Sequence, residues 1–258
     1  LEGMPLGWSM DLIVPSDDTI PYESAYQGYL GMTGLFMRHK ITVGGYYKTM
    51  ENLVYYTNAA NIFSASFAGW KDNVEVGNGS SYGIETLYEY SGKRLSARVA
   101  YTLSKTDRTF ENLNKGNPFP AKFDRRHILN TSVEYDLGRT EITKQGISSA
   151  FTLQSGHWES YRLYSYESIT PDDDKYLIPY FDESPNNLQM PAYIRLDIGY
   201  FRNWRSASQK INYKLQVGVY NILNRHNPLL LMYDDDADQW MELSLIPIMP
   251  TVSFRIEF

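Results

Sequence analysis

Cysteine is absent from the 258-residue sequence. Disulfide bonds, thiolate metal ligands and a cysteine nucleophile are therefore excluded. The chain also has no block of basic residues, and its formal net charge is -6. We therefore expect no nucleic-acid partner, because binding to phosphates needs clustered Lys and Arg. No window approaches the roughly 18 uninterrupted apolar residues of a membrane-spanning helix.

Motifs of enzyme chemistry are missing as well. The sequence contains four histidines, and none has HExxH or other zinc spacing: they are His39, His127, His157 and His226. No GxSxG, Walker or GxGxxG element occurs in its required context. We predict a protein that is not an enzyme and has no catalytic residue, metal site or cofactor.

The first ten residues, LEGMPLGWSM, contain neither a basic segment nor an apolar core typical of a signal peptide. We expect a chain that is processed or that is a fragment of a longer protein.

Alternation of apolar and polar residues is the main pattern present. It predicts nine strands, with no convincing amphipathic helix. The strands are expected at about 24–37, 40–56, 79–91, 93–105, 126–137, 143–155, 193–200, 211–220 and 250–258. In the clearest one, YIRLDIGY, Ile194, Leu196 and Ile198 share a face opposite Arg195 and Asp197.

The connections between these strands alternate in length. Short ones are expected at 38–40, 91–93, 137–142 and 202–210, and long ones at about 58–78, 106–125, 156–190 and 221–249. In an up-and-down antiparallel sheet, successive connections lie at opposite ends, so all short turns gather at one end. Transmembrane barrels sort their loops in this way, with short periplasmic turns and long extracellular loops.

Strand length and tyrosine content favour lipid over a soluble core. Several segments run ten residues or more, as tilted membrane strands do, whereas ordinary strands have about five or six residues. The chain has 22 tyrosines, and Tyr settles at membrane interfaces because its ring is apolar and its tip polar. The fold class expected is an all-β, antiparallel, up-and-down transmembrane barrel. Single-chain bacterial barrels have an even number of strands, so nine strands do not close and earlier strands are expected elsewhere.

Several stretches resemble the C-terminal barrel of TonB-dependent outer-membrane transporters, particularly those of Bacteroidetes-like bacteria. They are SAYQGYLGM with ITVGGYYKTMENLVYY, YGIETLYEYSGKRLSARVAYTLSKT, NPFPAKFDRRHILNTSVEYDL, VGVYNILNRHNP and LSLIPIMPTVSFRIEF. The resemblance implies that residues 1–258 are the C-terminal part of one Gram-negative outer-membrane domain. About nine strands of a probable 22-stranded barrel would be present, and the plug would lie outside this chain.

The resemblance also implies partners and an orientation. The partners would be outer-membrane lipid, the remaining strands and plug, TonB through the missing N-terminal part, the barrel insertion machinery and a surface lipoprotein. The long loops would be extracellular, and the short turns and C-terminus periplasmic. The insertion machinery would read a C-terminal signal formed by alternate apolar residues: Val252, Phe254, Ile256 and Phe258.

Two residue sets are candidates for contact with a nutrient ligand or with the interior. The long segment 156–190 is rich in aromatic residues that suit sugars or flat ligands, so we predict ligand binding at Trp158, Tyr161, Tyr164, Tyr166, Tyr176 and Tyr180. Charged residues on the polar face are predicted to face the lumen: Arg126, Glu134, Arg195, Asp197, Lys214 and Arg255. Hydrogen bonding within the barrel wall explains each of these six charged residues equally well, without any contact to the plug or to a ligand.

Other interpretations remain open from the sequence. Acidic runs at 172–174 and 234–238 lack the DxDxDG spacing of a calcium loop, which favours solvated loops over calcium sites. The predicted function is nutrient import through a TonB-dependent receptor. The alternatives are a non-transporting outer-membrane barrel, such as a porin or adhesin, and a soluble carbohydrate-binding β domain. The transported substrate and oligomeric state are left open.

Overall fold

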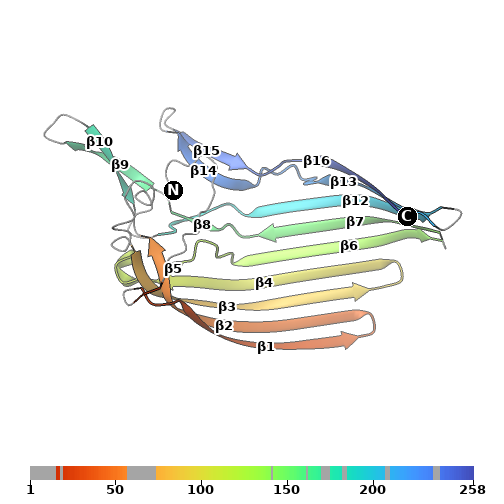
Figure 1. Cartoon of the computed structure of the whole chain (residues 1–258), viewed down its shortest axis with the longest axis horizontal. Helices are drawn as coiled ribbons and strands as arrows, with labels where there is room; N and C mark the ends of the chain where they lie inside the picture. Colours follow the sequence, from red (N-terminus) through yellow and green to blue (C-terminus); the bar gives the residue numbers. More distant parts are fainter. Residues whose placement is uncertain are drawn as a thin grey trace.

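The computed structural model describes residues 16–17, 20–56, 74–140, 142–160, 162–169, 175–181, 185–206, 210–234 and 239–258. The long strands among them form one antiparallel sheet, in which they follow one another in sequence order (Figure 1). The long strands are β1 (Ser24–Phe36), β2 (His39–Tyr56), β3 (Val74–Ser91), β4 (Leu95–Thr109), β6 (His127–Arg139), β7 (Thr143–Gln154), β12 (Tyr193–Arg205), β13 (Asn212–Tyr220) and β16 (Met249–Glu257). The nine predicted strands are therefore confirmed, as an all-β antiparallel meander.

Three strands extend further than the alternation predicted. β3 begins at Val74 instead of residue 79, β4 continues to Thr109 instead of 105, and β12 continues to Arg205 instead of 200. The segment added to β4, TDRT, is polar, and the segment added to β12, FRNWR, breaks the apolar pattern at Arg202. Backbone pairing holds them nevertheless, since Asn78 pairs with Thr109 and Trp204 with Tyr213.

The connections are sorted by length between the two ends of the sheet. The strand ends that short turns join, from β1 to β2, β3 to β4, β6 to β7 and β12 to β13, lie at the end where the C-terminus is found, which we call the short-turn end (Figure 1). At the other end, longer stretches of sequence separate the consecutive strands: 57–73, 110–126, 155–192 and 221–248, of which 57–73 lies outside the described residues. We call this the long-loop end, and the predicted alternation is confirmed.

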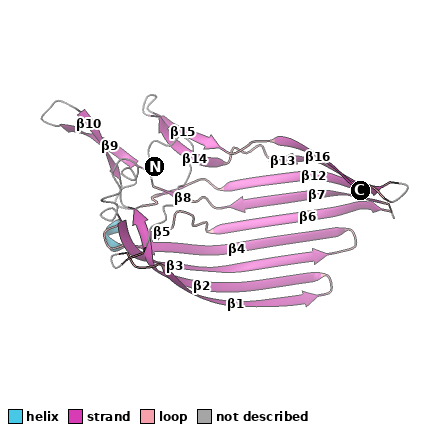
Figure 2. Ribbon diagram, in the orientation of Figure 1, coloured by secondary structure: helices cyan, strands magenta, loops and turns pink. Residues whose placement is uncertain are grey.

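Small elements gather at the long-loop end. The two-residue strand β5 (Phe119–Pro120) pairs with β4, and three separate pairs are formed by β8 (Trp158–Glu159) with β11 (Leu188–Gln189), β9 (Arg162–Ile169) with β10 (Lys175–Phe181), and β14 (Pro228–Asp234) with β15 (Gln239–Ser244). A 3-10 turn, η3 (Asn114–Gly116), is the short helical element at this end (Figure 2). Within the described residues, no helix is long and apolar enough to span a membrane.

The register separates an apolar face from a polar face of the sheet. Ile198 lies opposite Val219, and Leu215 opposite Phe254, on the apolar face. Phe254 is 54% exposed and Val252 is 73% exposed, so no second layer of described residues covers this face. The described sheet is not a sandwich with a packed interior, in agreement with the predicted contact between apolar side chains and hydrocarbon.

The buried apolar cluster lies at the long-loop end and not along the sheet. Leu53, Phe110 and Phe119 form its centre. The rings of Phe110 and Phe119 stack at 5.9 Å, and Tyr55 contacts both. This cluster fixes the connection between β4 and β6 over the end of β2.

Candidate ligand vestibule and transport wall

The connection between β4 and β6 folds back onto the strand that it leaves. The Ala121 amide donates to the Thr106 carbonyl at 2.9 Å, and the Thr106 amide donates to Asp124 Oδ1 at 2.8 Å. Asp124 is 6% exposed. Burial raises the pKa of its carboxyl group, although the Thr106 hydrogen bond and the charge of Arg126 act in the opposite direction. Asp124 thus holds the base of this connection against β4.

β8 joins this connection to the next long one. The Trp158 amide donates to the Lys122 carbonyl at 2.9 Å. The Glu159 carboxylate contacts Lys122 Nζ at 3.0 Å and His157 Nε2 at 3.2 Å. Burial raises the pKa of Glu159, but the His157 hydrogen bond and the Lys122 charge outweigh burial, so the pKa lies below its ordinary value. The two connections therefore share an ion-paired contact.

A buried asparagine fastens the far end of the same region. Asn186 Nδ2 donates to the Pro120 carbonyl at 2.7 Å, and the Asn186 amide donates to Ser160 Oγ at 2.9 Å. Its φ of 54° lies in the left-handed region, which Asn tolerates better than most residues. Sequence reasoning missed this anchor, because its partner lies 66 residues away.

The segment after β13 forms a second anchor, which we call the asparagine turn (Asn221, Asn224 and Asn227). Asn221 is fully buried, and its side-chain amide donates to the carbonyls of Arg225 at 2.9 Å and Ile246 at 3.3 Å. Asn227 accepts from the Ile194 amide at 2.8 Å and donates to the Ile194 carbonyl at 3.0 Å. Asn224 Oδ1 accepts from the Ile248 amide at 3.1 Å.

The asparagine turn therefore ties together the start of β12, the chain after β13 and the chain before β16. It positions the base of the β14–β15 pair. The YNILN stretch contributed to the family resemblance, but the sequence alone assigned it no such role.

The predicted aromatic ligand residues occupy the long-loop end. Trp158 lies in β8, and its buried indole nitrogen has no hydrogen-bond partner among the described residues. Within the β9–β10 pair, Tyr164 lies opposite Tyr180, and Tyr176 opposite Ser168. Tyr166 pairs with Ile178, so the four tyrosines occupy alternate positions that belong to the same set of register pairs in this hairpin. Tyr161 lies outside the described residues.

The predicted lumen residues lie along the polar face of the sheet or at its rim. Arg195 contacts Asp197 at 3.1 Å and donates to the hydroxyls of Tyr193 at 3.0 Å and Tyr220 at 3.2 Å. Its guanidinium also lies 4.7 Å from the Tyr220 ring centre. This network rigidifies the polar wall near the long-loop end.

Ion pairs occupy the polar face nearer the short-turn end. Glu134 pairs with Lys144 at 2.7 Å, and Lys214 with Glu257 at 2.7 Å. Arg255 pairs in register with Lys214. Arg126 precedes β6, and its carbonyl accepts from the Ser104 amide at 3.1 Å. Ion pairs between side chains of the wall itself therefore hold the polar face together.

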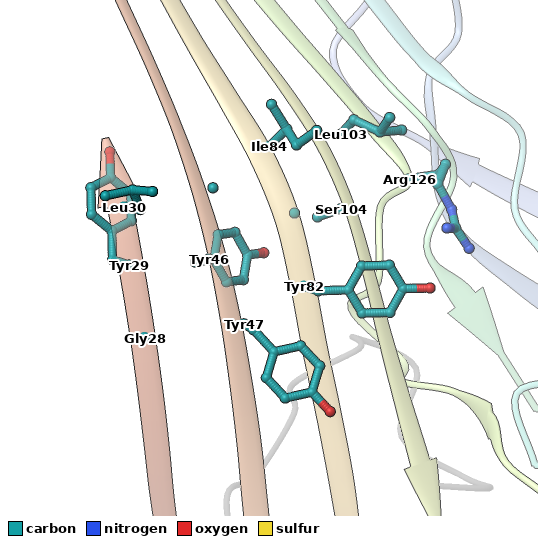
Figure 3. A pocket seen from close by; sticks show the side chains of 12 residues that line it. Gly28, Tyr29, Leu30, Tyr46, Tyr47, Tyr82, Ile84, Leu103, Ser104 and Arg126 are labelled. Carbon is teal, nitrogen blue, oxygen red and sulfur yellow. The ribbon is translucent and has the colours of Figure 1, made fainter. Parts of the chain in front are cut away.

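Shallow grooves are found on both faces of the described sheet. The polar-face groove has a volume of about 770 Å³ and includes Glu134, Lys144 and Asp197 in its lining. The other, of about 710 Å³, runs between Tyr47 and Tyr82 on one side and Leu30, Ile84 and Leu103 on the other (Figure 3). These five side chains lie on the apolar face by register, and Gly45 leaves the space between them. The second groove therefore opens on the apolar side of the wall.

The predicted C-terminal signal forms part of the apolar face. Val252 pairs with Val217, Phe254 with Leu215 and Ile256 with Tyr213. Phe258 follows β16 and is 96% exposed. The four side chains are thus available to another molecule or to lipid.

The two acidic runs are considered as calcium sites from the sequence, and most of their residues are not described. Residues 172–174 and 235–238 lie outside the described residues. Among the residues that are described, no three His, Asp or Glu side chains form a group that could hold a metal ion.

A family model described as "TonB dependent receptor-like, beta-barrel" matches residues 22–222. The chain is also similar to the FrpB iron transporter from Neisseria meningitidis (F3-3 variant), with 14% identity and a TM-score of 0.54 over 93% of this chain and 32% of that one. The ferripyoverdine receptor of the Pseudomonas aeruginosa outer membrane matches with 11% identity and a TM-score of 0.53, over 91% of this chain and 27% of the receptor. No curated protein matches the chain.

The chain thus spans about a third or less of the length of these two solved proteins. At such low sequence identity, the structural likeness shows a shared fold.

Proposed function

The chain belongs to the TonB-dependent receptor-like β-barrel family of the outer membrane, and from this premise we propose that it forms part of the wall and external vestibule of a nutrient importer. The family consists of receptors and not enzymes, as predicted. Membership also decides against the soluble carbohydrate-binding domain. The observation that supports import most directly is the gathering of the small described elements of the long connections, β5, β8–β11, β14 and β15, at one end of a wall with a polar face.

In this proposal the long-loop end is extracellular and the short turns are periplasmic, as in transmembrane barrels generally. The aromatic residues of 158–181 capture the ligand. The polar-face residues Glu134, Arg195, Asp197, Lys214 and Arg255, with Arg126 at the rim, face the lumen and plug. The remaining strands, the plug, TonB and a surface lipoprotein are the proposed partners, and energy comes from the inner membrane. The exposed C-terminal residues Val252, Phe254, Ile256 and Phe258 are the proposed signal for the insertion machinery.

The test is uptake by cells that express the complete receptor. Ferric siderophores, cobalamin, oligosaccharides and peptides are supplied separately, and uptake is compared in cells with and without TonB. Import that needs both the receptor and TonB supports the proposal. Receptor-dependent uptake that persists without TonB would instead identify a porin, and the absence of uptake of every class would point to an adhesin.

The vestibule is tested with a matched pair of variants on the compound taken up. Tyr164 and Tyr180 are backbone register partners in the β9–β10 ladder, and Tyr47 and Tyr82 are register partners on the apolar face. We expect Tyr164→Ser with Tyr180→Ser to weaken binding about tenfold, since aromatic stacking contributes about 0.5–1.5 kcal/mol for each contact. Tyr47→Ser with Tyr82→Ser should leave affinity unchanged. Equal affinities in both variants would contradict ligand capture by this hairpin.

A further inference from the structure

An exposed arginine interrupts the apolar face near the short-turn end. Arg202 lies three positions before the end of β12, opposite Gln145 on β7 and Leu215 on β13. Its parity places it with Tyr200 and Trp204 on the apolar face. A charged side chain facing hydrocarbon is unfavourable, and long basic side chains therefore extend toward the headgroup region.

An aromatic cluster supports this arginine. The Trp204 and Tyr213 rings stack at 5.3 Å with an 18° interplanar angle, and Phe254 lies 6.1 Å from Trp204 and 6.3 Å from Tyr213. The Arg202 guanidinium lies 5.6 Å from the centre of the Trp204 ring. Trp and Tyr concentrate where a membrane meets water, so the cluster marks the depth of lipid headgroups.

Arg202 has no anionic partner in the described part of the chain. Its opposite neighbours on the apolar face, Gln145 and Leu215, are neutral, and Gln145 Oε1 already accepts from the Tyr200 hydroxyl at 2.9 Å. The nearby Lys214–Glu257 ion pair belongs to the polar face. Arg205 and Lys210 add exposed positive charge beside the same turn. Within the described residues, the apolar side of this rim therefore carries the charge of Arg202 without a paired carboxylate.

We propose that Arg202, held against Trp204, binds the phosphate headgroup of an anionic phospholipid at the short-turn rim of the sheet. A planar guanidinium suits bidentate contact with phosphate oxygens, and stacking on the indole fixes its plane. Tyr213 and Phe254 contact the adjoining glycerol and upper acyl region. The lipid is the occupant because the charge lies on a face that is otherwise apolar. This inference depends on the outer-membrane location and not on nutrient import.

The experiment uses the complete receptor reconstituted in nanodiscs containing equal amounts of phosphatidylglycerol and phosphatidylcholine. Native mass spectrometry of the released protein counts the lipids that remain bound. We expect phosphatidylglycerol to be retained about fivefold over phosphatidylcholine, since one basic residue near an anionic surface contributes about 1 kcal/mol. Arg202→Gln should abolish this preference, and Arg202→Lys should retain part of it.

Arg98→Gln is the matched control. Arg98 is exposed, lies three positions from the short-turn end of β4, and pairs with Ser132 on the polar face. The substitution Arg98→Gln removes the same charge at a similar depth but from the opposite face of the sheet, so the lipid preference should persist. Heat-modifiable gel mobility verifies that each variant is folded.

Three outcomes would overturn the proposal. They are no lipid preference in the natural sequence, an unchanged preference in folded Arg202→Gln, and an equal loss in Arg98→Gln. A dimer that disappears in Arg202→Gln would assign this rim to a second copy of the receptor instead.

Discussion

At the scale of single residues, Glu159 shows how charge stabilises the long-loop end. Its carboxylate bridges Lys122 and His157 between two long connections. Because its folded-state pKa is depressed, the ionised form stabilises the fold above its ordinary pKa, and this contribution disappears as pH falls through the lower, folded-state value. Asp124 shows the opposite shift, because burial of its carboxyl group dominates.

We therefore predict that Glu159→Gln destabilises the contact between the two connections by about 1 kcal/mol at neutral pH. Hydrogen exchange at the Trp158 amide, which donates to Lys122, measures this contact. After correction for intrinsic exchange, protection in the natural sequence should fall as pH drops from the ordinary carboxyl pKa through the lower folded-state pKa, whereas the variant should show little change over the same range. The same acid response in both proteins would mean that another group controls the contact.

At the scale of elements, the asparagine turn is expected to determine the position of the β14–β15 pair. Asn221 has a φ of 51°, is fully buried and satisfies the carbonyls of Arg225 and Ile246. We predict that Asn221→Ala destabilises this region by about 2–4 kcal/mol, because buried carbonyls lose partners and Ala is strained at positive φ. Asn221→Gly relieves the strain but lacks the amide, so it should recover only part of the loss.

The measurement is exchange protection of the Ile248 amide, which is bonded to Asn224. Protection should decrease in the order natural sequence, Gly variant, Ala variant. An Ala variant with the natural level of protection would show that the backbone of the turn, and not its amide side chain, positions this pair.

The long strands and the asparagine turn differ in how far the sequence could predict them. The long strands followed from alternation, because a wall with different environments on its two faces repeats every second residue. Alternation could not locate the bulge between Asp136 and Gly138, which removes Leu137 from the regular ladder. It also could not reveal the anchors Asn186 and Asn221, since they bond to the carbonyls of Pro120 and Ile246, which lie 66 and 25 residues away. Phe201 is another example: it lies on the polar face but is buried against Gly146, where a Cβ atom would be 2.6 Å from its ring.

At the scale of the whole molecule, the sheet has two unpaired edges, β1 and β16. β1 has 13 residues, which pair with β2 on one side and have no partner strand among the described residues on the other side. Backbone groups left unpaired in hydrocarbon each cost several kcal/mol, so membrane sheets close on themselves. The apolar face and the free edges together require additional strands if this wall is to span a bilayer.

We predict that residues 22–258 expressed alone will not form a stable barrel in lipid, whereas the complete receptor will. Both proteins are refolded into the same phospholipid vesicles and analysed by gel mobility before and after boiling. The complete receptor should show a heat-modifiable, protease-resistant band. The isolated segment should show neither, because the exposed amides of β1 and β16 favour aggregation over closure. A compact, protease-resistant band from the segment alone would demonstrate that these strands close by themselves, and the plugged, larger barrel would then have to be abandoned as the setting for this wall.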